Sequence, residues 1–282
     1  MNPREATLDD SFRYCRRVTR QASSTFYLAS RMFARDVRRD LYAVYAFCRI
    51  ADDIADAPGL STLERQQELD LLLHTLKTER YSEGDLLWPA FFDVIGRHAI
   101  PITYFNELLE GVRADISPFE VKTLADLDRY SYLVAGTVGL MCTHILGQPD
   151  KQTLQGAKQL GIAMQYTNIM RDVSADAAIE RVYLPSVVMK RHGLSRKDVL
   201  AGQNEEALRS VLAELAQRAQ LCYDQAERAI HDLAPGNQRP VRIALNLYRG
   251  ILNRIEQNHF SVYNKRIRLS LPLKLMVAIK TR

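Results

Sequence analysis

Two short segments of the chain place acidic side chains at helical spacing beside arginines. In the first, Tyr45, Arg49, Asp52 and Asp56 are spaced by four, three and four residues, and Asp53 sits beside this row. An α-helix turns by about 100° per residue, so eleven residues return to within about 20° of the starting face. Two carboxylates one turn apart repel each other. The pattern therefore predicts a positively charged partner for these carboxylates.

The second segment repeats this geometry with a different set of polar residues. Gln165, Asn168, Asp172 and Asp176 are spaced by three, four and four residues, and Arg171 precedes Asp172. Every side chain of this row carries an oxygen atom that can bind a metal ion, and all four side chains again lie on one helical face. We expect the two rows to face each other across one site.

Oxygen ligands without histidine or cysteine are typical of Mg²⁺ or Mn²⁺ sites rather than zinc sites. Magnesium usually takes one or two carboxylates and completes its shell with water and phosphate oxygens. Arginines such as Arg171, and Arg181 a little downstream, are suited to the remaining phosphate charge. One D-x-x-x-D row is most often a solvated helix face, but two such rows with flanking arginines favour a metal and diphosphate site.

The elements that must position these rows are helices. Apolar residues recur at intervals of three and four, as in Leu41, Val44, Tyr45 and Cys48, and alternating Val, Ile and Thr runs are missing. The 282 residues include only 13 glycines and 10 prolines, which is few for a protein of short strands and turns. No low-complexity linker interrupts the chain. We expect an all-α protein of nine to eleven helices in a single domain spanning residues 1–282.

Composition and cysteine spacing narrow the class of protein and its compartment. Hydrophobic residues make up 47% of the chain and charged residues 25%, which is ordinary for a folded globular protein. Four scattered cysteines without a C-x-x-C pair favour neither zinc nor a disulfide framework. The charged N-terminus does not resemble a signal peptide. We therefore expect a cytoplasmic protein. Residues 130–149 carry no charged side chain, but their polar residues and glycines favour a buried core helix over a membrane span.

The net charge of +5 comes from the C-terminal tail. No acidic residue follows Glu256, and without the six basic residues beyond it 32 basic residues face 33 acidic ones. A nucleic-acid-binding protein would usually carry its charge on a face with interleaved aromatics, so we expect no nucleic-acid partner. The tail is also rich in Leu, Met, Val and Ile, which favours a helix packed on the core. It also allows peripheral contact with an anionic membrane.

The two acidic segments resemble those of the squalene/phytoene synthase family, which joins prenyl diphosphates head to head. The similar motifs are R-x-x-D-D-x-x-D at residues 49–56 and Q-x-x-N-x-x-R-D-x-x-x-D at residues 165–176. YSYLVAGTVGLM at 130–141 and SSTFYLAS at 23–30 resemble two further family segments. The likeness extends from about residue 11 to 280. It implies an isoprenoid synthase fold, with helices around a central apolar cavity.

The resemblance also implies roles for individual residues. The implied metal ligands for Mg²⁺, or Mn²⁺, are Asp52, Asp53, Asp56, Asn168, Asp172 and Asp176. The implied substrate-binding residues are Ser23, Phe26, Ser30, Arg49, Val134, Val138, Gln165, Arg171, Arg181 and Arg266. The implied catalytic residues, which assist ionisation, are Tyr45, Tyr130 and Tyr248. Small residues on the 130–141 segment either leave room for prenyl chains or allow helices to pack closely.

The implied reaction begins with ionisation of an allylic diphosphate, because metal ions and arginines stabilise the negative charge of the departing diphosphate. A second prenyl diphosphate attacks the cation to give a cyclopropylcarbinyl diphosphate, which ionises again and rearranges to the 1–1′ product. We expect two geranylgeranyl diphosphates to give phytoene, the first committed step of carotenoid synthesis, without NADPH. Ser30, one turn after Phe26, would leave depth for the longer chain.

Several alternatives remain at this point. Two farnesyl diphosphates would give presqualene diphosphate, dehydrosqualene or squalene. More remote readings are a terpene cyclase and a non-enzymatic scaffold on a membrane surface. For the partners we expect prenyl diphosphates, and for the assembly a monomer or weak dimer.

Overall fold

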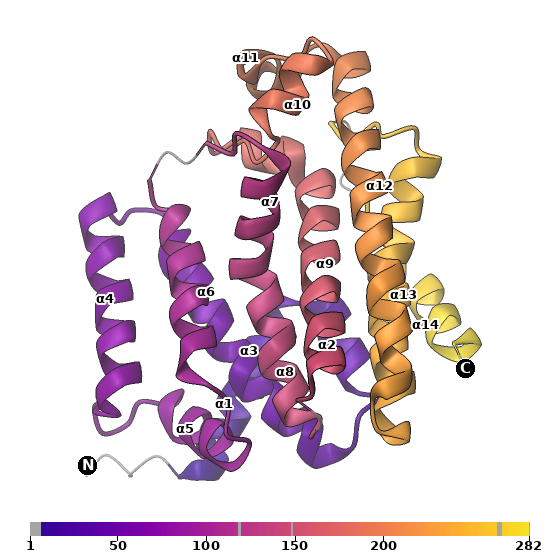
Figure 1. The fold of residues 1–282 in the computed structure, drawn as a ribbon. Helices are drawn as coiled ribbons and strands as arrows, with labels where there is room; N and C mark the ends of the chain where they lie inside the picture. Colours follow the sequence, from indigo (N-terminus) through magenta and orange to yellow (C-terminus); the bar gives the residue numbers. More distant parts are fainter. Residues whose placement is uncertain (1–6, 118–119, 148, 264–266, 282) are drawn as a thin grey trace.

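The computed structural model describes residues 7–117, 120–147, 149–263 and 267–281. Within these ranges every regular element is helical, which confirms the all-α expectation (Figure 1). The α-helices number more than the nine to eleven expected, because several are short. They are α1 (Leu8–Ala22), α2 (Ser24–Ser30), α3 (Arg35–Ala55), α4 (Thr62–Thr78), α5 (Trp88–Arg97), α6 (Ile102–Ala114), α7 (Leu124–Ser131), α8 (Thr137–Ile145), α9 (Lys151–Ala177), α10 (Ser186–Arg191), α11 (Arg196–Ala201), α12 (Glu205–Ala229), α13 (Pro235–Gln257) and α14 (Leu271–Lys280). A π-helical turn, η1 (Tyr132–Gly136), joins α7 to α8, and a 3₁₀ turn, η2 (Ile230–Asp232), follows α12.

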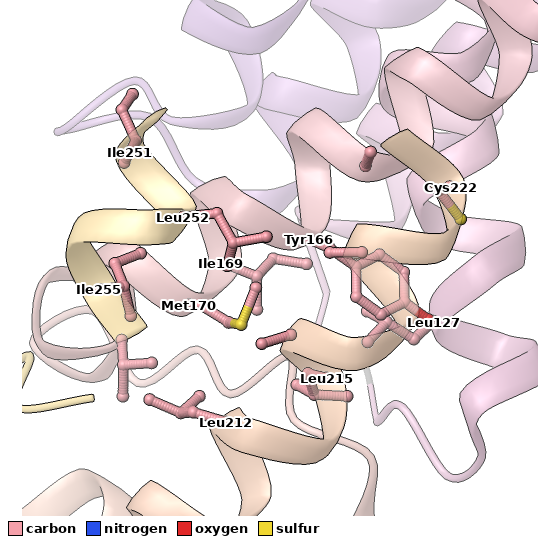
Figure 2. Packing of buried hydrophobic residues seen from close by; sticks show 14 of the residues in the cluster. Leu127, Tyr166, Ile169, Met170, Leu212, Leu215, Cys222, Ile251, Leu252 and Ile255 are labelled. Atoms are coloured by element: carbon pink, nitrogen blue, oxygen red, sulfur yellow. The ribbon is translucent and has the colours of Figure 1, made fainter. Parts of the chain in front are cut away.

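Helix α9 lies at the centre of the molecule. It packs against α12 and α13 on one side and against η1 and α8 on another (Figure 1). Figure 2 shows Tyr166, Ile169 and Met170 of α9 among apolar side chains of α7, α12 and α13. A second apolar cluster surrounds α3 and draws on α1, α5, α6 and α8. Helices α3 and α9 thus belong to different clusters, and each presents its polar face to the space between them.

The ends of α3 and α9 fix where their acidic residues lie. Asp56 is the C-cap of α3, and Asp52 lies in the last turn of that helix. Asp172 and Asp176 lie in the last two turns of α9, whose other end is capped by the Asp150 side chain. The C-terminal end of a helix carries partial negative charge, so carboxylates there are unfavourable unless a cation offsets them. Both acidic rows sit at this costly position.

Close helix contacts around η1 depend on glycines. A Cβ on Gly161 of α9 would lie 2.3 Å from the carbonyl oxygen of Ala135, and one on Gly139 would lie 2.4 Å from that of Ala157. The backbone N–H of Thr137 donates a hydrogen bond to the Tyr132 carbonyl across the wider π turn. The glycines of the 130–141 segment therefore serve close helix packing. The segment is largely buried, as expected.

The C-terminal helix α14 differs from the other helices in its exposure. None of its residues is buried, although Leu273, Val277 and Ala278 pack against the cluster around α9. Arg239 of α13 donates a 3.0 Å hydrogen bond to the Thr281 carbonyl just after the helix. Across the described ranges, no helix is both long and apolar enough to span a membrane.

Candidate active site

The two acidic rows meet at one polar cavity of about 860 Å³. Elements far apart in the sequence line it together, chiefly α3 and α9, with contributions from α1, α13 and the segment before α14. The structure brings to this cavity most of the residues that the sequence singled out, namely Ser23, Tyr45, Arg49, Asp52, Asp56, Tyr130, Val134, Gln165, Asn168, Arg171, Asp172, Asp176, Arg181 and Tyr248. Arg266 lies outside the described residues.

The carboxylates of the two helix ends influence one another electrostatically. The pKa of Asp52 is raised to about 7, chiefly by burial and in part by the neighbouring Asp115 and Asp56, against the opposing effect of Arg49. Burial also raises the pKa of Asp176 to about 7, with Asp172 and Asp115 adding to the effect. Such crowding of buried carboxylates favours a site that takes up positive charge.

Two arginines already contact these carboxylates. Arg181 donates to Asp56 at 2.6 Å, joining the segment after α9 to the end of α3. Arg171 donates to its neighbour Asp172 at 2.9 Å, and both side chains are largely buried. These guanidinium groups neutralise part of the acidic charge and lie where an incoming anion would meet them.

Asp53 lies apart from the other side chains expected to bind metal. Its side chain is 54% exposed, forms an ion pair with Arg49 and is absent from the lining of the cavity. Asp53 follows Asp52 by one residue, which turns it about 100° away around the helix. Arg49, which lines the cavity, links this outer carboxylate to the site.

Two of the predicted tyrosines are held beside Ser23 at the start of α2. Ser23, Tyr45 and Tyr248 line the polar cavity together, and burial raises the pKa of both phenols. The Tyr45 ring also stacks on Phe26 with ring centroids 4.5 Å apart. These tyrosines are therefore protonated and lie at the boundary between polar and apolar surroundings.

A second, mostly apolar cavity of about 300 Å³ adjoins the polar one. The residues that line both are Tyr45, Arg49, Asp52, Val134, Gln165, Asn168 and Tyr248. Phe26 and Val138, two of the implied substrate-binding residues, also line the apolar cavity. Ala135 and Gly139 contribute to its wall, so the small residues that allow close helix packing also leave space beside it.

The expectation that Ser30 faces this cavity is not met. Ala29 and Phe33 form the wall of the cavity near this end of α2, and Ser30 is absent from both linings. The Ser30 hydroxyl instead donates to the Tyr27 carbonyl at 2.9 Å and contacts the Tyr42 hydroxyl at 3.0 Å. A spacing of three rather than four residues after Phe26 points to the cavity on this short helix.

Several residues of the site were missed by the sequence reasoning. Asp115, the C-cap of α6, lines the polar cavity and accepts hydrogen bonds from Tyr130 and Tyr183. Burial raises the pKa of Asp115 to about 6, although both tyrosines and Arg181 lower it. Lys274 of α14 also lines the cavity. Asp115 belongs to no helical row of polar residues, so periodicity could not reveal it.

The donor set fits hard divalent cations shared with a ligand. Among the described residues no group of three or more His, Cys, Asp or Glu is already arranged around a single metal ion. The carboxylates are instead divided between the ends of α3 and α9. Magnesium commonly takes one or two carboxylates together with phosphate oxygens, so this division suits ions that a diphosphate completes.

The chain is similar to known proteins over nearly its whole length. The family model described as Squalene/phytoene synthase matches residues 19–273. The chain is 35% identical to phytoene synthase 2 of Solanum lycopersicum, over 95% of this chain and 89% of that protein. It is also 35% identical to 15-cis-phytoene synthase of Synechocystis, over 96% of this chain and 84% of that protein.

Solved structures are similar as well. A dehydrosqualene synthase in complex with ligand superposes with a TM-score of 0.88 at 30% identity, over 97% of this chain and 96% of that one. A squalene synthase of Alicyclobacillus acidocaldarius superposes with a TM-score of 0.81 at 26% identity, over 90% of this chain and 95% of that one.

Proposed function

Because this chain belongs to the squalene/phytoene synthase family, we propose that it condenses two geranylgeranyl diphosphates head to head to phytoene. The observation that carries this proposal is the junction of the two cavities. Carboxylates and arginines that suit a metal-bound diphosphate line the polar cavity, and the adjoining apolar cavity suits a prenyl chain. The two cavities together thus suit both the diphosphate group and the prenyl chain of one substrate molecule.

The extent of the apolar cavity supports the longer substrate. Thr153 and Asn168 both line it and are separated by fifteen residues of α9, or about 22 Å of helix. An extended isoprene unit spans about 5 Å, given carbon–carbon bonds near 1.5 Å, so four units match this length. The alternative substrate is farnesyl diphosphate, since one similar structure is a dehydrosqualene synthase.

The proposed metal ligands are the oxygen-bearing side chains that line the polar cavity, Asp52, Asp56, Asn168, Asp172 and Asp176. Bound Mg²⁺, or Mn²⁺, supplies positive charge that favours departure of the diphosphate. Arg49, Arg171 and Arg181 bind the diphosphate oxygens, and release of Arg181 from Asp56 frees that carboxylate. Gln165 and Ser23 complete the polar wall.

The apolar wall protects the cations from water. Phe26, Val134 and Val138 line the chain-binding space and offer no nucleophile to an allylic cation. Tyr45 and Tyr248 lie where both cavities meet, so their oxygens and ring faces border the reacting carbon atoms. Tyr130 lies on the polar side. The cyclopropylcarbinyl diphosphate forms here with loss of one diphosphate and one proton. It ionises again by loss of the second diphosphate and rearranges to a 1–1′ linked cation, which loses a proton to give the product.

Incubation of the purified protein with each diphosphate separately tests this function. With geranylgeranyl diphosphate and Mg²⁺, we expect phytoene and released diphosphate without NADPH. Excess EDTA should abolish both. Predominant dehydrosqualene from farnesyl diphosphate would favour the alternative substrate. Diphosphate release at the normal rate in EDTA would contradict the metal requirement.

We also propose that α14 contacts the surface of an anionic membrane. Leu271, Leu275, Met276 and Ile279 are all exposed on this helix, and the exposed Lys280 adds positive charge. A basic helix with an uncovered apolar face is typical of peripheral membrane contact, and the product is a water-insoluble lipid. The cytoplasmic location, the single domain and the monomer or weak dimer stay predictions.

A further inference from the structure

Asp115 holds two tyrosine hydroxyls at the edge of the polar cavity. The Tyr130 hydroxyl donates to Asp115 Oδ2 at 2.9 Å, and the Tyr183 hydroxyl donates to Oδ1 at 2.8 Å. The two rings stack with centroids 5.0 Å apart and planes inclined by 20°. All three residues line the cavity. We call this group of three residues the Asp115 cluster.

The main chain of Asp115 holds a third functional group. Arg181 Nη2 donates to the Asp115 carbonyl oxygen at 2.9 Å, while Arg181 Nη1 donates to Asp56. The cluster therefore joins the end of α6 to the segment at 181–183, which follows α9, and through Arg181 to the end of α3. Asp115, which belongs to neither acidic row, thus holds the side chains of Tyr130, Tyr183 and Arg181 beside the site.

The hydrogen bonds determine what the tyrosines can offer to a ligand. A tyrosine hydroxyl has one proton to donate, and its oxygen retains lone pairs. Here the proton of each hydroxyl is directed to a carboxylate oxygen of Asp115. Such oxygens present negative potential to the cavity and do not donate a proton to a diphosphate at the same time.

We propose that Asp115 is a positioning residue that holds the hydroxyl oxygens of Tyr130 and Tyr183 at the polar side of the site, where they stabilise the positive charge that develops as diphosphate departs. This inference rests on the proposed function. Fixed dipoles aimed at developing charge stabilise a transition state without having to reorganise during the reaction. Asp115 acts through the tyrosines, so its removal should affect the chemical step more than the binding of substrate.

The chain contains a matched cluster away from the cavities. Asp128 accepts a 2.7 Å hydrogen bond from the Tyr166 hydroxyl and a 2.8 Å bond from Arg218 Nε. It lines neither cavity. The same substitution at Asp128 therefore disturbs the same kind of aspartate, tyrosine and arginine contacts without touching the site.

The test measures kcat and KM for geranylgeranyl diphosphate with Mg²⁺ in the full chain. Asp115→Asn keeps the shape of the side chain but replaces one acceptor oxygen with a donor. We expect kcat to fall about 10- to 100-fold, as for loss of an oriented electrostatic group, with KM changed less than about threefold. Asp128→Asn should keep kcat within about twofold, since nothing that lines the site changes.

A double-mutant cycle separates orientation of the tyrosines from a structural role. In a Tyr130→Phe/Tyr183→Phe background the hydroxyls are gone, so Asp115→Asn should change kcat by less than about threefold. An undiminished loss in that background, or a retained kcat in Asp115→Asn alone, would overturn the inference. Circular dichroism and Tm of each variant identify folding defects, and Asp115→Ala in the same cycle supplies the answer if Asp115→Asn is misfolded. A wild type that forms no product would overturn the proposed function instead.

Discussion

At the scale of single residues, neighbouring aspartates on α3 have different surroundings. Asp52 is enclosed in the polar cavity, whereas Asp53 is exposed and paired with Arg49. We expect Asp52→Asn to lower kcat by at least about 10²-fold, because a group that helps to hold charge at the reacting centre is lost. Asp53→Asn should cost about tenfold or less, acting through Arg49. Steady-state kinetics at saturating Mg²⁺ measure both, and equal losses would return Asp53 to the metal site.

Asp40 makes a pH-dependent contribution to stability. Its carboxylate is buried, which alone would raise its pKa, but hydrogen bonds from Arg97 and His98 outweigh burial and lower it. Arg39 lies 3.9 Å away. A lowered carboxyl pKa in the folded state stabilises the protein above the unfolded pKa of about 4, and this stabilisation is lost as pH falls through the folded pKa.

The expected result is a pH-dependent difference between wild type and Asp40→Asn. The substitution should lower the free energy of unfolding by about 2 kcal/mol at pH 7, because hydrogen bonds to a charged group are lost. Urea denaturation at pH 7 and pH 3.5 measures this. The difference should shrink at the lower pH, and a constant difference would show that the charge of Asp40 is not responsible.

At the scale of elements, the contact between η1 and α9 depends on Gly161. A Cβ there would approach the Ala135 carbonyl oxygen to 2.3 Å, and this oxygen belongs to the backbone. Gly161→Ala should destabilise the protein by about 1–3 kcal/mol or more through overpacking. Gly96→Ala on α5 is the control, since its Cβ meets nothing within 4 Å and should stabilise by about 0.5–1 kcal/mol. Urea denaturation should give opposite signs for the two variants.

Helix α14 is the element on which the membrane proposal depends. Leu271 of α14 and Leu63 of α4 are each 63% exposed, so they form a matched pair. Leu271→Ser should weaken co-sedimentation with anionic liposomes, because it removes apolar area from the docking face. Leu63→Ser should leave it unchanged. Binding that rises with anionic lipid and falls with salt is expected, whereas equal loss in both variants would exclude α14 as the contact.

At the scale of the whole molecule, the sequence by itself determined the helical fold class and the composition of the two acidic rows. Spacings of three and four residues fix which side chains share a helix face, and this is a local property of the backbone. Asp52, Asp56, Asp172 and Asp176 could therefore be grouped without a structure. The resemblance of the surrounding motifs then indicated the family, which the comparisons confirm.

Only the tertiary structure decided which neighbours complete the site. Asp115 and Lys274 reach the cavity from the end of α6 and from α14, through packing between segments far apart in the sequence. Packing also turned Asp53 outwards and placed Ser30 against Tyr42 instead of the cavity. Periodicity specifies a face of one helix, but which elements meet that face depends on how all the apolar surfaces are buried together.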